Sequence, residues 1–315
     1  METQVDTAGN TVEIFRSETL IKGQPTAIDC LRIDGQTFSV NRNPFSLVSL
    51  ADEWYEDVRT PYALIEALKK HSGATPDIFT FWQRLPDLDP KYPFYCEWES
   101  IAVLPVISFD HWWTEQISSR TRNLIRKAKK DGLEVRQTTY DDNFVRGMTD
   151  IFNETPVRQG RRFWHYGKNF ETVKRQFSRF ISREEMIGAY HKGEMVGFMM
   201  VGDAGRFALT GQILSKLKHR DKATNNALIA KAVELCENKS WPYLVYLYWS
   251  DTSLSEFKRR CGFRETKVPR YFVPLTPKGE LALRLGLHRG WKAAIPNRVW
   301  DSLRKMRAHW YSLIG

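Results

Sequence analysis

Side chains suited to group transfer crowd one short segment of the sequence, residues 153–167. Two of them, Glu154 and His165, are able to accept a proton, so each is a candidate general base. The others are suited to holding a polar acceptor, and they are Arg158, Gln159, Arg161, Trp164 and Tyr166. Arginine forks bind carboxylates and phosphates through two hydrogen bonds, and aromatic rings stack on sugars. We therefore expect this segment to hold the acceptor of a transfer reaction.

The same segment allows a plainer interpretation. Phe163 and Trp164 are large enough to bury themselves in a core while the neighbouring arginines stay in solvent. A lone histidine such as His165 makes a structural hydrogen bond more often than it catalyses. The sequence leaves both interpretations open.

Composition favours a phosphate-bearing partner. Lysine and arginine outnumber the acidic residues, which gives a net charge of +10 and an isoelectric point near 9.4. Such a balance suits a nucleotide, an RNA, an anionic sugar or a phospholipid surface, although solubility alone also explains it. The cysteines Cys30, Cys96, Cys236 and Cys261 are far apart, so neither a metal site nor a disulfide is expected.

No apolar run approaches the length of a membrane span, and the polar start does not read as a secretory signal. The expected location is therefore the cytoplasm, with peripheral contact at the inner membrane face as an extension. That extension rests on residues 276–315, a basic and amphipathic tail that suits an anionic bilayer. Docking of this tail on its own domain is the alternative.

The elements expected to position these residues are strands mixed with helices, an α/β (α+β) pattern. In the first half we predict a hairpin over 30–40 around Asp34–Gly35, a helix from Pro61, and strands over 77–82 and 95–103. A helix is predicted over 110–131, ending at Gly132.

The second half predicts a longer series. In order, it comprises a strand over 133–138, helices over 141–153 and 170–181, a hairpin over 186–201, a strand over 207–214, a helix over 223–237, a strand over 243–249, a helix over 252–260 and a short strand over 271–273.

Residues 119–275 resemble the GNAT acyltransferase fold through the hairpin over 188–201, the helix after the next strand, and the closing run Phe257-Lys-Arg-Arg-Cys-Gly-Phe263. The run from Arg122 to Gly132 is similar to the helix that opens the second domain of the FemABX peptidyltransferases, and Phe257–Lys258 resembles a Phe-Lys pair of that family. Those proteins carry two GNAT-like domains in tandem. The resemblance thus implies a GNAT-like mixed sheet flanked by helices, with domains over 1–109 and 110–275 and a tail over 276–315.

The resemblance also bears on the donor. Acetyl-CoA users of this fold hold the pyrophosphate with a glycine-rich turn, whereas residues 215–226 contain no glycine. This turn is cationic instead, and its candidate donor-binding residues are Lys216, Lys218, Arg220, Lys222 and Asn225. FemABX-like proteins use aminoacyl-tRNA, which a basic groove suits. The donor is expected to be acyl-CoA or aminoacyl-tRNA, with no tightly bound cofactor.

Lys258 is the expected electrostatic stabiliser of the reacting carbonyl, although it also fits a solvated lysine beside Arg259 and Arg260. The sequence therefore predicts an N-acyltransferase that moves an acyl or aminoacyl group to an amine on a sugar, a peptide or a cell-envelope intermediate. The alternative is a non-catalytic protein of this fold that binds RNA or an anionic membrane surface. The acyl group, the acceptor and the oligomeric state stay open.

Overall fold

The structure is a computed structural model that describes residues 2–5, 11–21, 24–42, 45–70, 75–249 and 253–289. By contacts the chain divides into two compact units. Unit 1 comprises Met1–Trp98, Val157–Arg162 and Val268–Gly315, and unit 2 comprises Glu99–Pro156 and Phe163–Lys267. The expected boundaries near residues 109 and 275 stay predictions, because a unit of contacts is not by itself an independently folding domain.

Unit 1 is built on a sheet that begins with a series of antiparallel strands. They are β1 (Glu2–Val5), β2 (Thr11–Ile21), β3 (Gln24–Ile33), β4 (Gln36–Arg42) and β5 (Ser46–Leu50). Asp34 and Gly35 both have positive φ, 49° and 70°, as a two-residue hairpin turn requires, so the predicted hairpin is confirmed. After α1 (Pro61–Lys70), β6 (Ile78–Trp82) runs parallel to β5, and β15 (Arg264–Pro274) pairs antiparallel with β6.

Helices cover both faces of this sheet near β6. Leu64 and Leu68 of α1 pack with Phe38 and Phe79 in one apolar cluster. On the opposite face, Ala282 of α8 (Pro277–Arg284) packs with Ile78 and Phe272. The alternation of Ile78 and Phe79 between the two clusters follows from the two-residue period of a strand.

The strands of unit 2 pair in the order β7 (Tyr95–Pro105), β14 (Tyr243–Tyr246), β13 (Ala208–Ser215), β12 (Glu194–Asp203), β11 (Glu184–His191) and β8 (Leu133–Thr138). The neighbours are antiparallel except β13 and β14, which are parallel. The strands β7 and β15 each run from one unit into the other.

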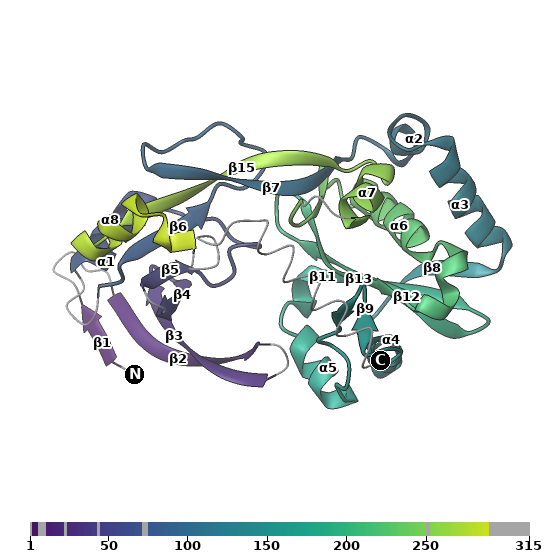
Figure 1. Ribbon diagram of the computed structural model, residues 1–315, viewed down its shortest axis with the longest axis horizontal. Helices are drawn as coiled ribbons and strands as arrows, with labels where there is room; N and C mark the ends of the chain where they lie inside the picture. The colour runs from purple at the N-terminus through teal and green to yellow at the C-terminus, as the bar shows by residue number, and fades with distance from the viewer. Residues whose placement is uncertain are drawn as a thin grey trace. The chain divides into compact units, whose positions relative to one another are not determined.

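Both faces of the unit 2 sheet are covered (Figure 1). Alternate residues of β12 belong to different clusters, with Met199 packing under α6 (Thr224–Asn238) and Met200 packing under α4 (Asp142–Phe152). The helix α3 (Ser119–Lys130) lies with α6, and α5 (Phe170–Phe177) lies with α4. A sheet buried on both faces explains why β12 reads as a near-continuous apolar run.

The predicted order of elements in the second half is confirmed from β8 to β15. Unit 2 contains three antiparallel strands followed by a helix and a parallel strand, namely β11, β12, β13, α6 and β14. Unit 1 contains the same succession in β3, β4, β5, α1 and β6. The prediction of a GNAT-like mixed sheet flanked by helices is therefore confirmed, and the repeated succession is consistent with a tandem arrangement.

Several predicted boundaries were wrong. The single helix expected over 110–131 is interrupted at Ile117 and Ser118, whose backbone is extended, after α2 (Phe109–His111) and a π-turn (Trp112–Gln116). The Ser118 side chain caps α3, and Arg122 donates to the carbonyls of Trp113, Thr114 and Ile117, so both new helix ends are satisfied.

The strand β15 is much longer than the predicted 271–273, β14 ends earlier than 249, and α5 ends at Phe177 and is followed by a 3-10 turn (Ile181–Arg183). Where a helix or strand ends depends on its tertiary contacts, so local sequence propensity alone predicted these ends incorrectly.

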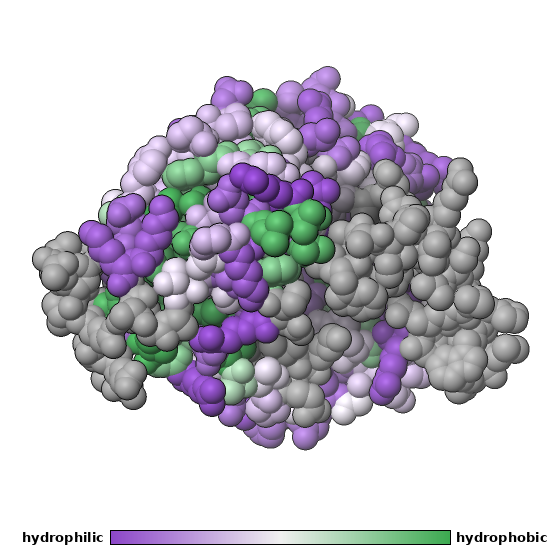
Figure 2. Space-filling view, turned by 60° about the vertical axis from the view of Figure 1, so that its left-hand side comes forward, coloured by the Kyte–Doolittle hydropathy of each residue, from purple (hydrophilic) through white to green (hydrophobic). Residues whose placement is uncertain are grey.

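The predicted amphipathic tail lies mostly outside the described residues. Within them are α8 and a 3-10 turn (Leu287–Arg289), and Leu281 of α8 and Leu285 at its C-terminal end are 57% and 62% exposed. In the view of Figure 2, hydrophobic residues are exposed in small groups between hydrophilic ones. No helix among the described residues has the length and apolar content needed to cross a membrane.

Candidate functional site

The point at which β13 and β14 separate is the structural centre of the candidate site. Their parallel pairing is limited to Ala208 with Leu244 and Leu209 with Val245. A bulge follows at once, because Val201 of β12 pairs with Thr210 while its neighbour Met200 pairs with Gln212. A bulge redirects side chains locally, and here it falls where the two parallel strands stop pairing.

Lys258 holds the end of β14. This residue of α7 (Ser253–Arg260) is 1% exposed, and its Nζ donates to the carbonyls of Tyr246, Leu247 and Tyr248 at 2.9, 2.7 and 2.8 Å. Burial lowers the pKa of Lys258 to about 8. All three of its donors are used by backbone, so the solvated lysine that the sequence allowed is not what the structure contains. The predicted role in stabilising the reacting carbonyl stays a prediction.

His165 is buried against aromatic rings. It is 2% exposed and stacks on Phe152 with ring centroids 4.2 Å apart. Burial, together with the nearby charge of Lys168, lowers the pKa of His165 to about 3, so the imidazole is neutral at physiological pH. A base this weak does not retain a proton at neutral pH, and a general-base role for His165 alone does not fit this setting.

Lys168 is the group that the sequence reasoning missed. Its Nζ lies 3.2 Å from Nδ1 of His165 and 2.6 Å from Oε1 of Gln176, and it sits over the ring of Trp164. Lys168 is 8% exposed, and burial lowers its pKa to about 8. Nε2 of His165 lies 3.4 Å from Nε2 of Gln212 on β13. A chain of polar groups thus runs from the bulged strand to a buried amine.

Asn153 fixes the backbone at Gly167 and Lys168. Its side chain donates to the carbonyl of Lys168 at 2.9 Å and accepts from the amide of Gly167 at 2.7 Å. One feature of the sequence distinguishes Lys168 from the other lysines, namely its place shortly after the aromatic run Phe163, Trp164 and His165.

Glu154 occupies the turn after β13. Its two carboxylate oxygens accept from the amides of Leu217 and Lys218 at 2.6 and 2.9 Å, at the start of a 3-10 turn (Leu217–Lys222). This is the turn for which the resemblance to acetyl-CoA users predicts backbone donors to a pyrophosphate. The role of Glu154 as general base stays a prediction, and the structure shows its carboxylate bound to the amides of this turn.

The cationic side chains of this turn are largely paired with acidic groups of the chain. Lys216 and Lys218 both bind Glu194, at 2.5 and 2.8 Å, and these bonds lower the pKa of Glu194 to about 2. Lys222 lies 3.3 Å from Asp221. Arg220 is exposed and makes no ion pair within the described part of the chain. The structure thus leaves less free positive charge here than the sequence suggested.

Three polar atoms near the parallel strands are buried without a hydrogen-bond partner among the described residues: the hydroxyls of Thr210 and Thr224 and Oδ1 of Asn225. Thr224 is the first residue of α6 and packs tightly on the sheet, because a Cβ at Gly197 would lie 2.5 Å from its methyl. Buried polar groups without partners are rare in native proteins, so these atoms are candidates for contact with a bound molecule.

The predicted acceptor segment is divided between the two units. Arg158, Gln159 and Arg161 belong to a small hairpin, β9 (Val157–Arg158) with β10 (Arg161–Arg162), that groups with unit 1, whereas Trp164 and Tyr166 belong to unit 2. Trp164 and Tyr166 are each 47% exposed. The structure therefore brings His165, Lys168 and Trp164 together in unit 2, whereas Arg158 and Arg161 group with unit 1.

A cavity of about 400 Å³ lies between α3 and α7 in unit 2. Its lining includes Arg120, Leu124, Asn226, Glu256, Phe257 and Arg260. The two helices are tied together where the Thr121 hydroxyl donates to the carbonyl of Arg260 at 3.2 Å. The two sequence segments that carry the FemABX resemblance thus line one cavity. No group of His, Cys, Asp and Glu side chains fit to hold a metal ion occurs in the described ranges.

Comparison with known proteins supports the fold. Neither a protein-family model nor a curated protein matches the sequence. Among solved structures, FemX superimposes with a TM-score of 0.53 at 11% identity, over 82% of this chain and 88% of FemX. This chain shares the fold of FemX. The resemblance to FemABX-like GNAT proteins is thereby confirmed at the level of fold.

Two further structures are similar. One is the C-terminal DUF2156 domain of a protein assigned as a lysylphosphatidylglycerol synthetase from Agrobacterium fabrum, with a TM-score of 0.54 and 11% identity over 82% of this chain and 87% of that one. The other is L-PGS from Bacillus licheniformis, with a TM-score of 0.51 and 13% identity over 76% and 81%. At these identities the likeness establishes the architecture, and the chemistry has to be argued from the site.

Proposed function

We propose that this protein is an acyltransferase that moves an acyl or aminoacyl group from an activated donor to an amine. The observation that carries the proposal is the chain of Gln212, His165 and Lys168, which leads from the separating strands β13 and β14 to a buried lysine. The names of the similar structures, FemX and lysylphosphatidylglycerol synthetase, agree with this class of reaction. The acceptor is expected to be a cell-envelope intermediate such as a lipid or a peptide.

Lys168 is the proposed final proton acceptor. An attacking amine has to lose a proton, and a base is most effective when its pKa lies near the working pH. In the tautomer with hydrogen on Nδ1, His165 donates to neutral Lys168, and its Nε2 lone pair faces the amide nitrogen of Gln212, a donor that the acceptor amine has to replace. The acceptor amine gives a proton to Nε2 while Nδ1 passes its own proton to Lys168, so the charge ends on the lysine. The resulting cation is stabilised by Trp164 and Gln176.

Lys258 acts in this proposal as a positioning residue. By binding three successive carbonyls it fixes the backbone of β14 beyond its last pairing with β13. Fixed backbone at the opening of the two strands provides a rigid surface for the reacting ester, and rigid placement of both reactants supplies much of the rate in acyl transfer.

Aminoacyl-tRNA is the proposed donor. The carboxylate of Glu154 already binds the amides of Leu217 and Lys218, so they are not available to the pyrophosphate of CoA. The remaining basic residues, such as Arg120 at the α3–α7 cavity and Arg220, are suited to a nucleic-acid backbone.

The test is a transfer assay with two donor classes. Purified protein is incubated with charged tRNA or with acyl-CoA, together with aminated envelope precursors and lipids, and labelled product is measured. Transfer from charged tRNA but not from acyl-CoA is expected. Absence of transfer from both donors contradicts the enzymatic role and favours the RNA- or membrane-binding alternative, which retention of RNA by Lys168→Met would then support.

A further inference from the structure

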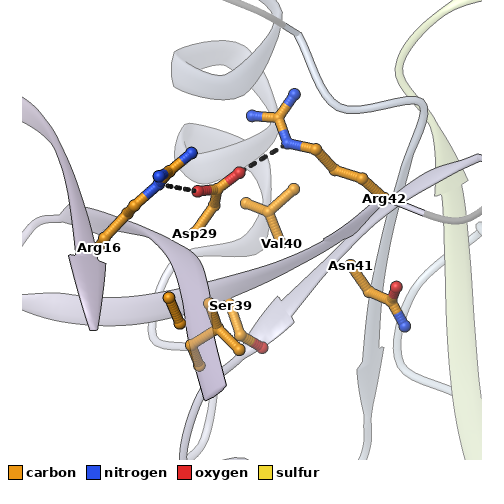
Figure 3. Close-up of a pocket in the computed structure, with 8 residues that line it drawn as sticks. Arg16, Asp29, Ser39, Val40, Asn41 and Arg42 are labelled. Atoms are coloured by element: carbon orange, nitrogen blue, oxygen red, sulfur yellow. Dashed lines mark hydrogen bonds and ion pairs between the residues drawn. The ribbon is translucent and has the colours of Figure 1, made fainter. Parts of the chain in front are cut away.

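The unit 1 sheet carries a cluster of charged residues that the proposed reaction does not use. Arg16 on β2, Asp29 on β3 and Arg42 on β4 lie next to one another across three strands (Figure 3). Nε of Arg16 donates to Oδ1 of Asp29 at 3.2 Å, and Nε of Arg42 donates to Oδ2 at 2.8 Å. One carboxylate thus orients two guanidinium groups.

The position of this cluster follows from strand register. Arg16 pairs with Asp29, and Asp29 pairs with Val40, just as Ile14 pairs with Leu31 and Leu31 with Phe38 two residues further along. Side chains two apart share a face, so the charged row continues the face that is apolar beneath α1. The cluster therefore marks the point at which this sheet face becomes polar.

Stability does not explain the pairing. The side chains of Arg16 and Arg42 are 80% and 55% exposed, and exposed ion pairs contribute only about 0–1 kcal/mol. Each arginine uses only Nε toward Asp29, and the terminal nitrogens point away from the carboxylate in Figure 3. The cluster keeps one net positive charge and two open guanidinium forks.

A cavity of about 650 Å³ adjoins these forks. Val40, Ala27 and Ile28 give it apolar lining, and Ser39 and Asn41 add neutral polar groups. Its volume lies within the range of small-molecule sites and greatly exceeds a lone phosphate. Two forks at the edge of a partly apolar cavity match a ligand with a phosphate group and an organic part.

We propose that Arg16 and Arg42 bind the phosphate or diphosphate group of an organic phosphoester, with the ester's carbon portion against Val40. Asp29 keeps both guanidinium groups in place and does not have to be displaced, because the ligand uses the terminal nitrogens. The site lies within unit 1 and does not depend on the acyl transfer proposed for unit 2.

The experiment measures binding of inorganic pyrophosphate and glycerol 1-phosphate by calorimetry on the full chain. Wild type is expected to bind, and the double variant R16Q/R42Q is expected to bind about tenfold or more weakly. The matched control is R32Q, which removes an exposed arginine that pairs with Glu13 at 2.9 Å and does not line the cavity. R32Q is expected to bind as wild type does, because the site needs forks rather than net charge alone.

Further arms identify the source of the phosphate. Cosedimentation with phosphatidylglycerol vesicles, compared with phosphatidylcholine vesicles, separates a lipid headgroup from a free phosphoester. R16K/R42K keeps the charge without the forks and is expected to bind more weakly than wild type. Undetectable binding of all these probes by wild type, equal binding by R16Q/R42Q, or equal loss in R32Q would each overturn the proposal. Thermal melting of every variant confirms folding, since all three arginines are exposed.

Discussion

Unit 2 contains two buried lysines that share a depressed pKa and differ in what surrounds them. Burial lowers the pKa of both Lys168 and Lys258 to about 8. Lys258 binds three backbone carbonyls, whereas Lys168 binds the side chains of His165 and Gln176 and the face of Trp164. Carbonyl oxygens only accept hydrogen bonds, so they suit a permanently protonated amine.

An imidazole can both donate and accept, so the surroundings of Lys168 suit either protonation state. The difference teaches that a shifted pKa alone does not identify a catalytic group. The partner has to be able to exchange a proton, and that condition selects Lys168. Substitution of each lysine should separate the two roles, Lys258 as a structural brace and Lys168 as a proton acceptor.

Replacing Lys258 by methionine is expected to give the largest effect. Three buried carbonyls lose their partner, and loss of one side of a buried charged interaction costs about 3–5 kcal/mol. Urea denaturation measures the change in the free energy of unfolding. The control K231M removes a lysine of α6 that pairs with Glu234 near the surface, and its cost is expected to stay below about 1 kcal/mol. A cost for K258M as small as that of the control would contradict the brace.

Lys168→Met should separate activity from stability. The variant removes a desolvated charge but leaves Oε1 of Gln176 and Nδ1 of His165 without their partner, so the free energy of unfolding is expected to fall by about 1–3 kcal/mol. Transfer activity is expected to fall by about 100-fold, the usual range for loss of a general base. The control K174M changes an exposed lysine of α5. Full activity in K168M would remove Lys168 from the mechanism.

His165 predicts a pH dependence of stability. Its pKa of about 3 in the folded protein lies below the value of 6.5 in the unfolded chain, so the unfolded state binds more protons in between. Stability is therefore lost as the pH falls from 6.5 toward 3, by about 2 kcal/mol at pH 5. Denaturation of wild type and H165F at pH 7 and pH 5 measures this. The idea fails if both proteins lose the same stability.

Glu154→Gln is expected to give the smallest effect. An amide accepts more weakly than a carboxylate from the amides of Leu217 and Lys218, which should cost about 1 kcal/mol. The control E237Q changes an exposed glutamate of α6 and is expected to be nearly neutral. Thermal melting compares the two. A neutral E154Q would show that this contact adds nothing to the stability of the turn.

Local signals in the sequence predicted most of the fold. The Asp34–Gly35 turn, Pro61 at the start of α1 and the hairpin over 186–201 each depend on nearby residues, and each is confirmed. The break at Ile117 was not predicted, because it depends on Arg122 reaching back to carbonyls of the preceding turn. The length of β15 depends on partner strands that lie far away in the sequence, and of these β6 pairs with Arg270–Pro274.

The site was harder to predict for the same reason. Lys258 was selected by family resemblance, yet its three carbonyl partners follow from the place where β14 ends. Lys168 was missed because its depressed pKa follows from burial in the folded protein, which the sequence does not show. The cationic turn was recognised, but Glu194 and Glu154, which occupy it, come from other segments.

The division of unit 1 between the two ends of the chain has a consequence for synthesis. Unit 2 is complete in sequence once Lys267 has been made, whereas unit 1 still lacks the part of β15 that pairs with β6. During translation the first strands of unit 1 are therefore made long before β15, and the edge of β6 that pairs with β15 stays unpaired until all of unit 2 has been synthesised. The protein begins unit 1 first and finishes it last.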